Sequence, residues 1–150
     1  MFSKHLGENK TRDLLISFLK QQETNRANHQ ITYNEKIEWR NDMVSSLLWR
    51  DNSKADEKRC EEAIRIIAND LSKYDAHISI LKKMLDDQAI TTSEKDMLIK
   101  EANNIFADVQ RRYESWGNGG VSLEYFQQVS HVCIVISEYN NIVNVKKHNC

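Results

Sequence analysis

The sequence predicts an all-α fold: an antiparallel bundle of about five helices, forming a single domain over residues 1–150. Proline, the strongest helix breaker, is absent from all 150 residues. Three apolar patterns with helical spacing continue for about 20 residues or more. The length allows one domain with a real core and is short for two.

The first two predicted helices have the weakest patterns. One covers about residues 9–25 and is apolar only around Leu14, Leu15, Phe18 and Leu19. Because that apolar group is small, residues 1–30 are alternatively interpreted as a loosely docked N-terminal arm. The other helix covers about residues 33–49, and its inward stripe consists of Tyr33, Ile37, Val44 and Leu48.

The third predicted helix, which ends near residue 85, has the strongest pattern. Its apolar residues alternate steps of four and three, which places them on one heptad seam: Cys60, Ile64, Ile67, Leu71, Tyr74, Ile78, Leu81 and Leu85. Other apolar side chains project about 120° or more from this seam. This secondary apolar face is made of Ile66, Ile80 and Met84, with His77 among them. The helix is therefore either covered on two sides or offers a second face to a partner.

The last two helices complete the predicted bundle. One is expected to begin with Thr91, Thr92 or Ser93 as its cap, and its seam is Leu98, Ala102, Ile105, Val109 and Tyr113. The other is expected to begin near Ser122 and to use Phe126, Val129, Cys133, Ile136 and Val143. Its centre, VCIVI, is β-branched enough for a strand, but its length and polar flanks favour a helix. Short links are expected near residues 50–55, 86–92 and 116–121.

Residues 81–106 read as a leucine-rich helix, an acidic turn, Ile-Thr and an acidic helix start. This pattern resembles the short helical hairpin of SHOCT domains, and the resemblance implies a role in association. It covers about a sixth of the chain. Any helical hairpin has physical reasons to choose an acidic turn and threonine caps, so no family is assigned from it.

Composition excludes several broad classes. The net charge of −1 argues against a general nucleic-acid binder, and the longest apolar run is far too short to span a membrane. The amino terminus lacks the apolar stretch of a secretory signal. Three cysteines without metal spacing favour a reducing compartment: the cytoplasm, or a host cytosol reached by export.

The glycine-rich stretch 114–125 was tested as a calcium loop. With Gly119 at the sixth position, Trp116 and Tyr125 occupy the third and twelfth positions, where oxygen ligands are required. A connector explains the stretch better, with Gly117 ending one helix and Ser122 capping the next. No cofactor or metal is expected, and the local motifs of known nucleophiles are absent, which disfavours an enzyme.

The candidate partner-binding residues lie off the inward stripe of the second helix: Trp39, Met43 and Trp49, with Arg40 and Arg50 at the rim. Aromatic and Met side chains flanked by arginine are typical of interface hot spots.

We therefore expect a non-enzymatic protein that acts by protein–protein contact. An inhibitor, immunity protein, adaptor or secretion-type chaperone of a microbe or mobile element would fit. Two alternatives stay open: a homodimer through the Cys60–Leu85 seam, and a small-ligand or haem sensor that uses His77 or His131.

Overall fold

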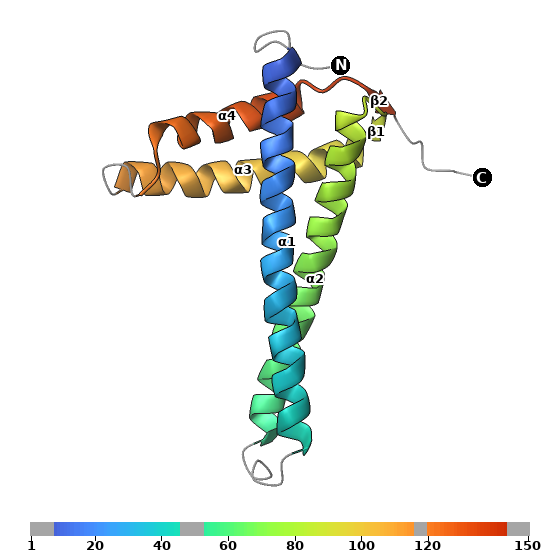
Figure 1. Cartoon of the computed structure of the whole chain (residues 1–150), viewed down its shortest axis with the longest axis vertical. Helices are drawn as coiled ribbons and strands as arrows, with labels where there is room; N and C mark the ends of the chain where they lie inside the picture. Colours follow the sequence, from blue (N-terminus) through green and yellow to red (C-terminus); the bar gives the residue numbers. More distant parts are fainter. Residues whose placement is uncertain (1–7, 46–52, 116–119, 144–150) are drawn as a thin grey trace, which may run out of the picture. The chain divides into compact units, whose positions relative to one another are not determined.

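The computed structural model describes residues 8–45, 53–115 and 120–143 (Figure 1). These residues form four helices: α1 (Glu8–Ser45), α2 (Ser53–Leu85), α3 (Thr92–Ser115) and α4 (Leu123–Ser137). They also form two short strands, β1 (Ile90–Thr91) and β2 (Ile142–Val143). The all-α fold class is confirmed. The expected number of about five helices is wrong for the described residues.

The described parts of the two weak helices predicted over residues 9–25 and 33–49 lie in one continuous helix, α1. No Gly or Pro occurs between Gly7 and Gly117, so the polar stretch 26–32 contains no strong breaker. Its polar side chains bond along the helix: Thr32 Oγ1 donates to the Asn28 carbonyl at 3.2 Å, and Gln30 Nε2 donates to Asn34 Oδ1 at 3.0 Å. Polarity alone therefore did not end the helix.

The described residues cluster into two compact units. Unit 1 contains residues up to 20 and from 77 onward, and unit 2 contains residues 21–76. The boundaries fall inside α1 and α2 and not in a linker. This division does not mark two separate domains, in agreement with the single domain predicted.

Unit 1 holds the larger core. Its buried side chains come from both ends of the chain: Leu14, Leu15, Phe18, Ile80, Leu81, Met84, Ile90, Leu98, Ala102, Val132, Val135, Ile136 and Tyr139. Leu14, Leu15 and Phe18 are 6%, 0% and 3% exposed, so these three side chains of α1 are core residues. Through these side chains α1 packs into the core of unit 1, and the interpretation of residues 1–30 as a loosely docked arm stays a prediction.

In unit 2, α1 and α2 pack against each other as an antiparallel pair. Arg26 contacts Asp75 at one end, and the Cys60 thiol donates to the Lys36 carbonyl at 3.3 Å nearer the other end. Met43, Cys60 and Ile64 are buried together, with Tyr33 and Ile37 packed against them. The described half of the predicted stripe, Tyr33 and Ile37, is thus confirmed as inward; the Val44 side chain and Leu48 lie outside the described residues.

The predicted seam of α2 packs within the chain. Cys60, Leu71 and Leu81 are buried at 1%, 8% and 0% exposure, and the remaining seam residues are buried or half-buried. The seam of α3 behaves in the same way, with Leu98, Ala102 and Val109 buried.

The turn between α2 and α3 is closed by two capping motifs. At the end of α2, Gln88 N–H donates to the Lys83 carbonyl at 2.9 Å and Asp87 N–H donates to the Met84 carbonyl at 3.0 Å. This is a Schellman motif, with Asp87 at φ 56° in the left-handed position that glycine usually takes. At the start of α3, Thr91 and Glu94 bond each other's backbone N–H groups. The predicted threonine cap is confirmed as Thr91.

The last helix is shorter than predicted. It ends at Ser137, and β2 pairs in parallel with β1, with Ile90 opposite Ile142 and Thr91 opposite Val143. Val143 is therefore a strand residue, 47% exposed, and not part of a helical seam. The buried Tyr139 fixes this segment: its hydroxyl donates to the Gln88 carbonyl at 2.6 Å, and its own carbonyl accepts from Lys95 Nζ at 2.9 Å.

Helix α4 lies antiparallel beside α3 in unit 1 (Figure 1). The ring of Phe126 packs edge-on against Phe106 and Tyr113, with centroids 5.7 and 4.8 Å away. Ser122, the predicted cap, accepts a hydrogen bond from Tyr125 N–H at 3.0 Å. In the described parts of the chain, no helix is long and apolar enough to cross a membrane.

Candidate functional site

The structure separates the predicted partner-binding residues. Trp39 is 40% exposed on α1, with Lys36 Nζ 5.5 Å from its ring centroid, and Arg40 is half-buried. Met43, by contrast, is only 2% exposed and packs with Cys60 and Ile64. Trp49 and Arg50 lie outside the described residues. The described members do not form one exposed surface.

Met43 is a core residue because of its register along the continuous helix. It follows Lys36 by seven residues, which is close to two full turns, so the two residues face the same direction. The carbonyl of Lys36 accepts the Cys60 thiol, so this direction points toward α2. The predicted stripe left out Met43 because Met43 lies about 100° around the helix from Val44, and the buried side of α1 is wider than that stripe.

The secondary apolar face of α2 is likewise divided. His77, Ile80 and Met84 are buried at 5%, 2% and 0% exposure in unit 1, whereas Ile66 is 48% exposed in unit 2. The first three lie where α2 is covered on more than one side, which is the structural alternative that the sequence left open. They do not offer a surface to a partner.

The two histidines considered as ligand sites have different environments. His77 Nδ1 lies 3.8 Å from Glu101 Oε2, and both side chains are largely shielded. His131 is half-buried in α4. Among the described residues, no group of three or more His, Cys, Asp or Glu side chains could hold a metal ion.

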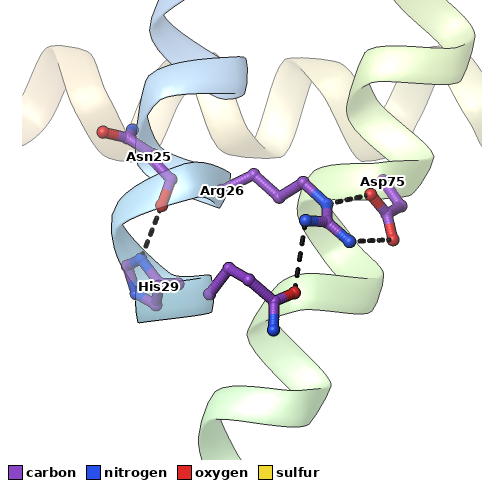
Figure 2. Close-up of polar contacts among 5 residues, drawn as sticks. Asn25, Arg26, His29 and Asp75 are labelled. Atoms are coloured by element: carbon purple, nitrogen blue, oxygen red, sulfur yellow. Dashed lines mark hydrogen bonds and ion pairs between the residues drawn. The ribbon is translucent and has the colours of Figure 1, made fainter. Parts of the chain in front are cut away.

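The most extensive polar contact of unit 2 surrounds Arg26 (Figure 2). Its Nε donates to Asp75 Oδ1 at 2.5 Å, and its Nη1 donates to Gln30 Oε1 at 3.4 Å. The hydrogen bond with Asp75, helped by the carboxylate charge, raises the pKa of Arg26 above its usual value. One turn along, the His29 ring packs edge-on against Tyr74 at 5.0 Å and bonds the Asn25 carbonyl through Nδ1 at 2.9 Å. The Arg26–Asp75 and His29–Tyr74 contacts tie α1 to α2.

The outer face of α4 exposes apolar side chains. Leu123 and Ile134 are 54% and 42% exposed, Gln127 is exposed and Ser130 is half-buried. At about 100° per residue, these four side chains fall within an arc of roughly 60°. The buried residues Val129, Val132, Val135 and Ile136 lie on the opposite side. We call Leu123, Gln127, Ser130 and Ile134 the α4 stripe.

The α4 stripe contains no charged residue. Glu124 is the one Asp, Glu, Lys or Arg between Glu114 and Glu138, in a chain that is 29% charged. The exposed side of the neighbouring α3, by comparison, carries Asp96, Lys100, Arg111 and Arg112. Sequence reasoning missed the stripe because it searched α4 for its core seam; the depletion of charge over residues 115–137 was the available signal.

Comparisons of the chain with protein-family profiles, with curated proteins and with solved structures find no match. The geometry of the chain itself must therefore support any functional proposal.

Proposed function

We propose that this protein acts by protein–protein contact and that the α4 stripe is part of its contact surface. The observation that carries the proposal is the combination of exposed Leu123 and Ile134 with an uncharged helix face between them. Depletion of charge at the centre of a surface patch, with apolar residues present, is the compositional signature of an interface.

Single exposed apolar residues are normal on protein surfaces, so their surroundings decide what they mean. Ile66 has Glu62 and Asp70 one helical turn away on either side, and charged neighbours keep such a site solvated. Within the stripe, the neighbours of Leu123 and Ile134 at the same spacing are Gln127 and Ser130, and Glu138 follows Ile134 by one turn at the C-cap of α4. Burial of the four stripe side chains themselves therefore requires no charge to be desolvated, and Glu138 lies at the edge of the stripe.

Trp39 remains a second candidate contact, on unit 2. Its exposed indole beside Lys36 is suited to a hot-spot role. Met43, which was predicted to share this surface with Trp39, is instead part of the core.

The test is native mass spectrometry of tagged protein purified from the cells that produce it. Wild type is compared with the double variant Leu123→Lys, Ile134→Lys and with the control Met97→Lys. Met97 is 41% exposed on α3 in the same unit, so the control places an equivalent charge on an equally exposed apolar position.

We expect wild type and Met97→Lys to carry a bound protein chain at fixed stoichiometry, either another protein or a second copy, and the double variant to lose it. Circular dichroism must show that all three proteins keep the same helix content. Complexes that persist unchanged in the double variant, or a wild type that carries no protein under any condition, would overturn the proposal.

A further inference from the structure

We draw no further inference here: the strongest candidate, the exposed outer face of α1 in unit 2 that carries Ile31, Glu35, Glu38 and Trp39, is a surface patch for which nothing in the described parts of the chain shows what covers it.

Discussion

The Glu94 carboxylate accepts a hydrogen bond from the backbone N–H of Thr91, and the Thr91 hydroxyl accepts one from the backbone N–H of Glu94, at 2.9 and 3.0 Å. This reciprocal box satisfies two backbone donors at the start of α3. Lys83, near the end of α2, adds an ion pair to the same carboxylate at 3.0 Å. One acidic side chain therefore links the start of α3 to the end of α2.

The box predicts a pH-dependent contribution to stability. The backbone hydrogen bond from Thr91, followed by the Lys83 contacts, lowers the pKa of Glu94, while partial burial opposes them. A lowered pKa in the folded state means that the stabilisation is present above the unfolded pKa of about 4.3 and is lost as the pH falls through the folded value. Glu94→Gln should lower the free energy of unfolding at pH 7 by about 0.5–1 kcal/mol and by much less near pH 3.

Urea unfolding at both pH values checks this expectation. Ser93→Ala, which changes an exposed neighbour that does not titrate, is the matched control and should have the same effect at both pH values. An equal deficit for Glu94→Gln at pH 3 and pH 7 would contradict the assignment.

The backbone conformation of Asp87 indicates a substitution that should stabilise the fold. It occupies the left-handed position of the Schellman motif at φ 56°, where a Cβ atom is unfavourable and glycine is free of that strain. Asp87→Gly should raise the free energy of unfolding by about 0.5–1 kcal/mol, and Asp87→Ala should lower it by a similar amount. Thermal unfolding of both variants measures the difference; a glycine variant less stable than the alanine variant would rule out this explanation.

The hydroxyl of Tyr139 should contribute measurably to the stability of the fold. Its side chain is 1% exposed, and burial, with the charge of Asp87, raises its pKa above the usual value. Tyr139→Phe keeps the ring but leaves the Gln88 carbonyl without this donor, so we expect a loss of about 1–2 kcal/mol. Tyr113→Phe keeps the ring packed on Phe126 in a half-buried site and should change stability by less than half as much. Equal effects of the two variants in urea unfolding would contradict a special role for the Tyr139 hydroxyl.

The sequence was most informative where apolar spacing was regular. The structure contains the predicted heptad seam of α2, the seam of α3 and the Ser122 cap. These features were predictable because buried positions require apolar residues and helix caps favour a few residue types. The helical reading of VCIVI was also correct: these residues are within α4, where Val132, Val135 and Ile136 are buried.

The features that the sequence did not predict depend on long-range contacts. The continuity of α1 through residues 26–32 accompanies contacts such as Arg26 with Asp75, 49 residues away, which no local pattern reveals. The pairing of β1 with β2 involves two residues on each strand and relies on backbone hydrogen bonds. The α4 stripe was missed for another reason: a surface is marked by which residues are absent from it, and periodicity searches look for residues that are present.

Met43 and Trp39 give the clearest test of which side of α1 is core. Met43 is 2% exposed against Cys60 and Ile64, so Met43→Ala should leave a cavity and lower the free energy of unfolding by about 2–4 kcal/mol. Trp39 is 40% exposed, so Trp39→Ala should lose about 1 kcal/mol or less, including its contact with Lys36. Urea unfolding followed by far-ultraviolet circular dichroism compares them directly. The reverse order of effects would mean that Trp39, and not Met43, belongs to the core of unit 2.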